Sequence, residues 1–243
     1  MTRKTSVFLF YAGVAVFSIG LLFVFRYLQK NDKPDTAAFE AIVNQGKSTA
    51  PEWFPLAKDL EGVNQKQEKV KLSDLKGKVW LVAEFFAVCP HCAVRNGQEL
   101  RQIADTFKDN PDFHIACISI DPEMDTPDKL ADYSQALGAN PRQWWFLNTG
   151  SNAGTHVYLS QELKFFSVKP RTDPADIASN GRYAHDLGFI LVDRNFNVVG
   201  KWPLADARSD QAKQLDPGLY DRLKTELYAR IRAELEKKPT TAN

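Results

Sequence analysis

The chain has 243 residues, which is long enough for one α/β domain with appendages and a sizeable hydrophobic core. Its 31 lysines and arginines against 30 aspartates and glutamates leave a net charge of +1, so no charge excess marks a surface for nucleic acid or anionic lipid. Three cysteines are too few for a disulfide-stapled scaffold. We therefore expect a globular domain with no nucleic-acid partner.

An uncharged apolar run of 19 residues, Val7 to Phe25, lies between positively charged residues near the N-terminus. A helix of that length spans about 28 Å, close to the hydrocarbon thickness of a bilayer. A cleaved signal peptide is the alternative, but its apolar region is typically ~7–15 residues long and ends in a small-residue site that this run lacks. We predict an uncleaved single-pass membrane anchor over residues 1–30, with the rest of the chain extracytoplasmic, in the periplasm or an equivalent compartment.

Three further regions follow the anchor. A polar stretch over residues 31–50 is predicted to be a tether, residues 51–205 a folded domain, and residues 206–243 a C-terminal helical extension. Within the domain, the segment Val79–Ala87 is almost continuously apolar and rich in strand-forming residues. Such a segment is typical of a strand buried on both faces in the middle of a mostly parallel sheet.

Strand and helix patterns alternate along the rest of the domain. Apolar or small residues at spacings of three and four after Cys92 predict an amphipathic helix. The predicted elements that follow are a strand over Phe113–Ile120, a helix from Thr126-Pro127 to about Gly138, a helix over Gly154–Phe165, and a hairpin of Phe189–Val192 with Val198–Lys201. This order predicts an α/β fold with an antiparallel pair at one side of the sheet.

The C-terminal extension carries a regular apolar pattern. After Asp216-Pro217, apolar residues recur at every fourth position between charged ones: Leu219, Leu223, Leu227, Ile231 and Leu235. This spacing predicts an amphipathic helix. We expect that helix to pack on the domain, with the binding of a partner protein as the alternative.

The sequence Cys89-Pro90-His91-Cys92 lies directly between the buried strand and the amphipathic helix. A cysteine in the first turn of a helix has its thiolate stabilised by free backbone N–H groups and by the helix dipole, and a protonated His91 would add positive charge. The second cysteine lies one turn further on the same side. The pair can close a disulfide or present two sulfur atoms to one metal ion, so Cys89 and Cys92 are predicted to be the reactive residues.

Two simpler explanations of this pair fit less well. A structural zinc ion takes four ligands, and the sequence has neither a second C-x-x-C nor an H-x-x-x-H. Inert buried thiols are not expected at the start of a helix beside proline and histidine. Cys117 lies inside a buried strand, where a cysteine behaves as a small hydrophobic residue, and we assign it no chemistry.

The histidines differ in what their positions indicate. His114 lies at the entry of a predicted strand and has no partner at a metal-binding spacing. His156 lies in a predicted helix, and we expect it at the surface or satisfied by hydrogen bonds rather than bound to a metal. His185 lies in the segment Tyr183–Gly188, just before the predicted strand Phe189–Val192.

The segment Leu72–Cys92 resembles membrane-tethered thioredoxin-like proteins. More particular motifs resemble the Sco/SenC family, membrane-anchored copper proteins that assist assembly of the binuclear copper site of cytochrome c oxidase. These motifs are Ser119-Ile120-Asp121-Pro122-Glu123, Asp125-Thr126-Pro127, and Trp145-Phe146-Leu147 before Thr149-Gly150. The resemblance covers roughly residues 54–202 and implies a thioredoxin-like fold, with a mixed sheet flanked by helices.

The resemblance also implies a metal site. In that family two cysteines and one distant histidine bind copper, and they map onto Cys89, Cys92 and His185. Thioredoxin-like reductases have a cis-proline before the corresponding strand, whereas this chain has no proline between Arg182 and Val192. The resemblance thus implies one copper ion on these three residues, and as partner the copper-site subunit of cytochrome c oxidase or another thiol-containing protein.

One departure from the family leaves two functions open. The family's cysteine spacing is C-x-x-x-C, whereas this chain has C-x-x-C, with the Pro-His pair of strongly oxidising DsbA-type proteins. The first hypothesis is a Sco-like copper-binding and thiol-redox protein. The alternative is a membrane-tethered thiol–disulfide oxidoreductase without a metal, an enzyme in which Cys89 attacks and Cys92 resolves the mixed disulfide.

Overall fold

The computed structural model describes Val14 and residues 18–23, 54–87 and 90–238, with only the backbone described for residues 90–95. The chain divides into two units, Met1–Phe39 and Glu40–Asn243. In the first unit, Val14 and residues 18–23 are helical, and their large apolar side chains are exposed. Most of the predicted anchor and all of the predicted tether lie outside the described residues. Within the described part of the chain, no helix has the length and apolarity needed to cross a bilayer.

The second unit is organised around one strand, β4 (Val79–Phe85). It pairs in parallel with β5 (Phe113–Ser119) and antiparallel with β9 (Phe189–Val192). All residues of β4 and β5 are buried, as expected for strands covered on both faces of a sheet. The strand order is β1-β10-β9-β4-β5-β6, with β1 at Phe54–Pro55, β6 at Trp144–Leu147 and β10 at Asn197–Trp202.

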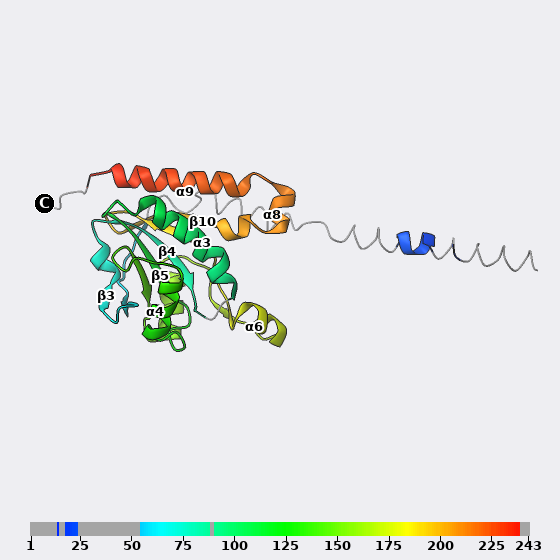
Figure 1. Cartoon of the computed structure of the whole chain (residues 1–243), viewed down its shortest axis with the longest axis horizontal. Helices are drawn as coiled ribbons and strands as arrows, with labels where there is room; N and C mark the ends of the chain where they lie inside the picture. Colours follow the sequence, from blue (N-terminus) through cyan, green and yellow to red (C-terminus); the bar gives the residue numbers. More distant parts are fainter. Residues whose placement is uncertain (1–13, 15–17, 24–53, 88–89, 239–243) are drawn as a thin grey trace, which may run out of the picture. The chain divides into compact units, whose positions relative to one another are not determined.

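Two helices make the parallel crossovers of this sheet, as Figure 1 shows. The helix α3 (Pro90–Phe107) joins β4 to β5, and α4 (Pro127–Ala136) joins β5 to β6. The hydroxyl of Thr126 caps α4 by accepting from the Lys129 N–H at 3.4 Å, and Gly138 follows the helix with φ +66°. The predicted start and end of this helix are confirmed.

The remaining elements are mostly short. Their bounds are β2 Glu61–Val63, β3 Lys69–Lys71, the 3-10 helix η1 Leu72–Leu75, α5 Asn152–Gln161, β7 Lys169–Pro170, α6 Pro174–Asn180, β8 Tyr183–Ala184, α7 Leu204–Ala207, α8 Asp210–Leu215 and α9 Leu219–Glu236. The helix α5 begins two residues before the predicted Gly154, because the Ser151 hydroxyl accepts from the Gly154 N–H and caps the helix at that earlier point. It also ends before the predicted Phe165.

Side chains of β4 alternate between the two faces of the sheet. On one face, Trp80 and Val82 belong to a buried cluster that includes Leu159 of α5 and Leu163 just after it. Glu84 follows Val82 on that same face, two residues further along the strand. On this face, the apolar core therefore ends at the charged side chain of Glu84, near the carboxyl end of β4.

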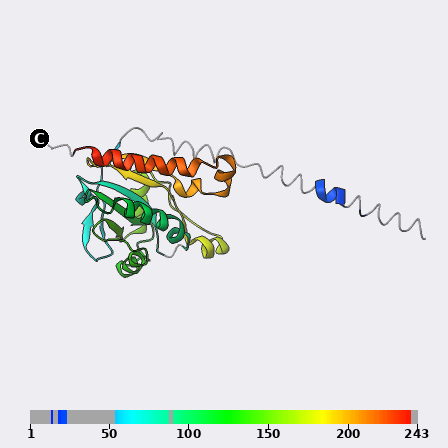
Figure 2. The same ribbon diagram turned by 45° about the horizontal axis from the view of Figure 1, so that its top comes forward.

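The C-terminal helix α9 packs on the domain. It contacts β4 and β10, and both views show it running alongside these strands (Figures 1 and 2). Four of the five apolar positions in the four-residue pattern, Leu219, Leu223, Leu227 and Ile231, are buried, and the fifth, Leu235, is half-buried. The buried Glu99 of α3 adds polar contacts to this packing. It accepts from the Tyr220 hydroxyl at 2.6 Å and pairs with Lys224 at 2.9 Å.

One buried histidine makes the stability of this fold depend on pH. The side chain of His114 on β5 packs edge-on against Trp145 with ring centroids 4.5 Å apart, and neither ring nitrogen has a hydrogen-bond partner among the described residues. Burial lowers the pKa of His114 to about 3, with a smaller effect from Lys78. In an unfolded chain the pKa of a histidine is about 6.5.

We expect acidification to destabilise the domain between these two pKa values. Below pH ~6.5 the unfolded chain binds a proton that the folded His114 does not, so the free energy of unfolding falls by up to about 1.4 kcal/mol per pH unit. His114→Phe removes the titrating group, and its free energy of unfolding in urea should decline less steeply from pH 6 to pH 4. Parallel pH profiles for the two proteins would contradict the prediction.

Candidate functional site

The predicted ligand His185 lies between β8 and β9, and its side chain is only 4% exposed. Its Nδ1 lies 2.8 Å from the carbonyl oxygen of Asp186. A carbonyl oxygen can only accept a hydrogen bond, so Nδ1 carries the proton. In the neutral imidazole, Nε2 is then the nitrogen with a lone pair. The local backbone thus selects the tautomer that would bind a metal through Nε2.

A buried carboxylate lies behind this histidine. The side chain of Glu84 accepts from the Asp186 N–H at 2.9 Å, and the same oxygen lies 3.5 Å from His185 Nδ1. Burial raises the pKa of Glu84, and the neighbouring His185 opposes that rise. The second oxygen, Oε1, has no hydrogen-bond partner within the described part of the chain.

The aromatic ring of Phe86 contacts both His185 and the glycine at the end of α6. The ring of Phe86 lies edge-on to His185, with centroids 5.6 Å apart. The same ring also lies against Gly181, where the backbone has φ +80° and an added Cβ would lie 2.4 Å from the Phe86 ring. Only glycine fits this close approach and backbone conformation. The segment leading to His185 is therefore held against the end of β4.

The helix that begins next to the cysteines also contacts this segment. The Asn96 side chain donates to the carbonyl oxygen of Leu187 at 3.0 Å, and Asn96 is 5% exposed. On α3, Asn96 follows Cys92 by four residues, so the two lie one turn apart on the same side of the helix. The histidine segment therefore meets α3 one turn from Cys92.

The cysteines themselves are only partly described. Cys92 lies in the first turn of α3, where a helix start was predicted, but its side chain is not described, and Cys89 lies outside the described residues. Over residues 54–87 and 96–238, no group of three or more histidine, cysteine, aspartate or glutamate side chains is arranged to hold a metal ion. The meeting of Cys89, Cys92 and His185 at one site thus stays a prediction.

The third cysteine behaves as the sequence indicates. Cys117 is a free, fully buried thiol on β5, and the Trp144 indole N–H donates to its sulfur at 3.2 Å. Burial raises the pKa of the Cys117 thiol to about 12, so the thiolate is not formed near neutral pH. No chemistry is assigned to it.

The segment after β5 supports the cysteine side of the site. The carboxylate of Asp125 accepts from the Ala87 N–H at 3.0 Å and from the Ser119 hydroxyl at 2.6 Å. Burial raises the pKa of Asp125, although both hydrogen bonds lower it. Ala87 precedes Cys89 by two residues. In the sequence this motif is visible only as a family resemblance, whereas in the structure its Asp125 fixes the backbone that leads to Cys89.

The same segment also supports the histidine side. Asp121 holds the guanidinium of Arg182 through both carboxylate oxygens, with Nη2–Oδ1 at 2.6 Å and Nε–Oδ2 at 3.1 Å. The Asn152 amide adds hydrogen bonds to Asp121 and to the Tyr183 hydroxyl. His156 lies 2.6 Å from the Ile120 carbonyl oxygen, which confirms the satisfied role expected for it.

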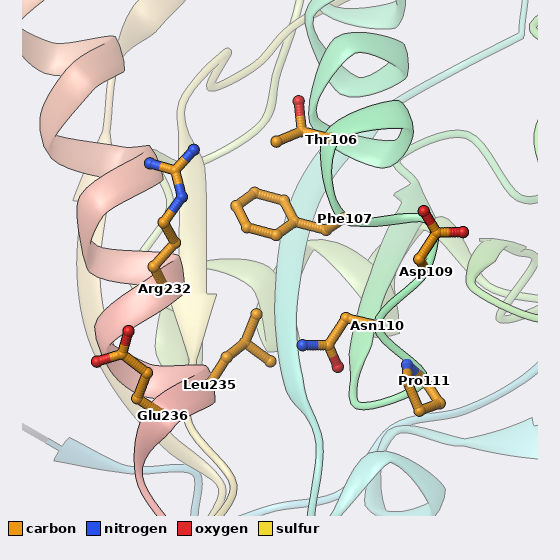
Figure 3. A pocket seen from close by; sticks show the side chains of 8 residues that line it. All are labelled: Thr106, Phe107, Asp109, Asn110, Pro111, Arg232, Leu235 and Glu236. Carbon is orange, nitrogen blue, oxygen red and sulfur yellow. The ribbon is translucent and has the colours of Figure 1, made fainter.

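Two hollows in the described surface lie away from His185. One of about 600 Å³ lies between the end of α3 and the last turns of α9, where Phe107 and Arg232 face each other across it (Figure 3). Another, of about 560 Å³, is lined by β2, β3 and residues 148–150. Neither hollow is lined by His185 or by the side chains that surround it.

Comparison with known proteins gives a family and a fold. A search of curated sequences found no match. A SCO1/SenC family lipoprotein from Bacillus anthracis is 22% identical, with 72% of this chain and 98% of that chain covered and a TM-score of 0.54. Copper-bound ScoI from Arabidopsis thaliana is 20% identical, with 72% and 99% covered and a TM-score of 0.52.

A third solved structure is BsSco, described as a member of the Sco family of cytochrome c oxidase assembly proteins. It is 18% identical, with 78% of this chain and 98% of that chain covered and a TM-score of 0.58. These likenesses confirm the predicted α/β thioredoxin-like fold. Residues 49–217 match the SCO1/SenC family itself. With about two thirds of its length in that match, this chain belongs to the SCO1/SenC family.

Proposed function

We propose that this protein binds one copper ion through the thiolates of Cys89 and Cys92 and the Nε2 atom of His185. In this proposal it works on the extracytoplasmic side of a membrane and assists the assembly of a copper site in a respiratory oxidase. The observation that carries the proposal is the hydrogen bond from Asn96 to Leu187 at 3.0 Å. That bond holds the histidine segment one helical turn from Cys92.

Family membership supports copper as the metal. The related structure from Arabidopsis thaliana was determined with copper bound, and so was ScoI from Bradyrhizobium japonicum. BsSco belongs to a family of cytochrome c oxidase assembly proteins. The corresponding partner of this chain would be the copper-site subunit of the oxidase, or another protein with reactive thiols.

The chemistry of the donors fits the same metal. Two thiolates and one imidazole form a soft ligand set that suits Cu(I). Thiols must lose their protons to bind, and the first turn of a helix favours the thiolate form because its backbone N–H groups have no partner within the helix. The Asp186 carbonyl keeps the proton of His185 on Nδ1, so Nε2 is the ring nitrogen whose lone pair would bind the metal. Copper is here the cargo that the protein receives and passes on.

Attachment to the membrane is the remaining part of the proposal. The apolar run Val7 to Phe25 has the length of a single span. With residues 1–30 as anchor and residues 31–50 as tether, the folded domain would stay close to a membrane-embedded oxidase.

The spacing Cys89-Pro90-His91-Cys92 favours a second function, thiol–disulfide exchange without a metal. In that reaction the Cys89 thiolate attacks a disulfide of the partner and releases one partner thiolate. The Cys92 thiolate then attacks the Cys89 sulfur and releases the second partner thiol. The partner gains two electrons and this protein is left with a Cys89–Cys92 disulfide. Both functions use the same sulfur atoms and are compatible in one protein.

Removing the histidine ligand should weaken Cu(I) binding. We expect His185→Ala to lower the Cu(I) affinity of the reduced protein at least tenfold, because one of three donors is lost, and outer contacts to metal ligands alone are worth about 10- to 100-fold. Competition with a Cu(I) chelator measures the change. His156→Ala is the matched control, since His156 bonds to the Ile120 carbonyl. Equal affinities for His185→Ala and the unaltered protein would refute the ligand assignment.

Trapping tests the second function. In Cys92→Ser the mixed disulfide formed by Cys89 cannot be resolved, so a partner protein should stay attached in a non-reducing gel and be released by a reductant. Cys89→Ser, which lacks the attacking thiolate, should trap nothing. If Cys92→Ser also captures no thiol-containing partner, thiol–disulfide exchange is not the function of the pair.

A further inference from the structure

Glu84 is a charged residue in an unusual place. It lies within the central strand of the sheet, is 2% exposed, and is the charged residue in an otherwise apolar segment from Val79 to Ala87. Taking a carboxylate out of water is strongly unfavourable unless hydrogen bonds and a counter-charge compensate it. The contacts of Glu84 therefore indicate what it does in this position.

Those contacts converge on the backbone and ring of the histidine segment. One carboxylate oxygen accepts from the Asp186 N–H at 2.9 Å and lies 3.5 Å from His185 Nδ1. The Asp186 carbonyl lies 2.8 Å from the same Nδ1. The backbone carbonyl of Asp186 and the carboxylate of Glu84 thus both lie near Nδ1 of His185.

The other charged groups near Glu84 are engaged with one another, so His185 is the ionisable group that can donate a hydrogen bond to its carboxylate. The carboxylate of Asp186 is engaged by the Lys201 ammonium and by the backbone N–H groups of Phe166 and Gly188. Asp206 of α7 is a further carboxyl near Asp186 and Lys201; burial, and to a smaller extent Asp186, raise the pKa of Asp206, and Lys201 opposes the rise. Among the described ionisable groups, the two that act on Glu84 are His185 and Asp186, and only His185 can offer it a proton.

We infer that Glu84 is a positioning residue for the metal ligand of this protein. Together with the Asp186 carbonyl, its carboxylate holds the Nδ1–H of His185, fixes the ring, and makes Nε2 a stronger donor. This inference rests on the proposed function, because it concerns the histidine that would bind copper. Partners that hold the second nitrogen of a metal-binding histidine typically change metal affinity 10- to 100-fold.

A purely structural role is the competing explanation. Glu84 also fastens the segment through the Asp186 N–H, and Glu84→Gln separates the two roles. A glutamine side chain has the same length and keeps a carbonyl oxygen for the Asp186 N–H, but it carries no negative charge. Glu99→Gln is the matched control. Glu99 is equally buried, on α3, and its partners are Tyr220, Arg208 and Lys224 rather than His185.

The experiment compares three full-length proteins: the unaltered chain, Glu84→Gln and Glu99→Gln. Cu(I) affinity is measured by chelator competition on the reduced proteins. The copper-free proteins are examined by ¹⁵N NMR of the histidine rings, which reports the tautomer of His185. We expect Glu84→Gln to lower the affinity about 10- to 100-fold and to shift the Nδ1 and Nε2 signals of His185. Glu99→Gln should leave both measurements unchanged.

Each contrary result has a distinct meaning. If the unaltered protein binds no copper, the proposed function fails and this inference fails with it. If the unaltered protein binds copper and Glu84→Gln matches it in affinity and in the His185 signals, only the inference fails. If Glu84→Gln does not fold, Glu84→Asp takes its place. That variant keeps the charge but withdraws the carboxylate from Nδ1, and the same losses are expected.

Discussion

The segment of residues 182–188 depends on contacts with three separate elements for its position. Asp121 after β5 holds its first residue, Glu84 of β4 holds the backbone next to His185, and Asn96 of α3 holds its far side. A segment with so little regular structure satisfies only some of its polar groups internally, so side chains from the sheet and helix supply further partners. The position of the histidine is thereby tied to the two elements that flank the cysteines.

Buried carboxylates are the means by which the sheet supports this arrangement. Glu84 lies near the carboxyl end of β4, and Asp121 and Asp125 lie in the loop that follows β5. Open α/β sheets typically bind their ligands at this edge. Each carboxylate is hydrogen-bonded to backbone or to a polar side chain that flanks the proposed copper site. The family motif after β5 thus holds the start of the cysteine loop on one side and the histidine segment on the other.

The parts of the fold that the sequence predicts are those with strong local patterns. The apolar run Val79–Ala87 predicts β4, whereas β6 was not predicted, because Trp144–Leu147 spans only four residues and shows no period of its own. His185 was identified as a candidate ligand from the family resemblance, together with its place before a predicted strand. Glu84 and Asn96 were missed because their roles depend on partners that lie 102 and 91 residues away. In the sequence, the feature that marks Glu84 is that it is a charged residue within an otherwise apolar predicted strand.

The central claim is that His185 and the two cysteines bind copper together, and X-ray absorption of the Cu(I)-loaded protein tests it most directly. The account predicts a first coordination shell of two sulfur atoms and one nitrogen, with the outer scattering of an imidazole ring. A shell made of sulfur alone, with no imidazole scattering, would contradict it. In that case the contacts of Glu84 and Asn96 would serve only to hold the segment of residues 182–188 in place, and copper binding would not depend on His185.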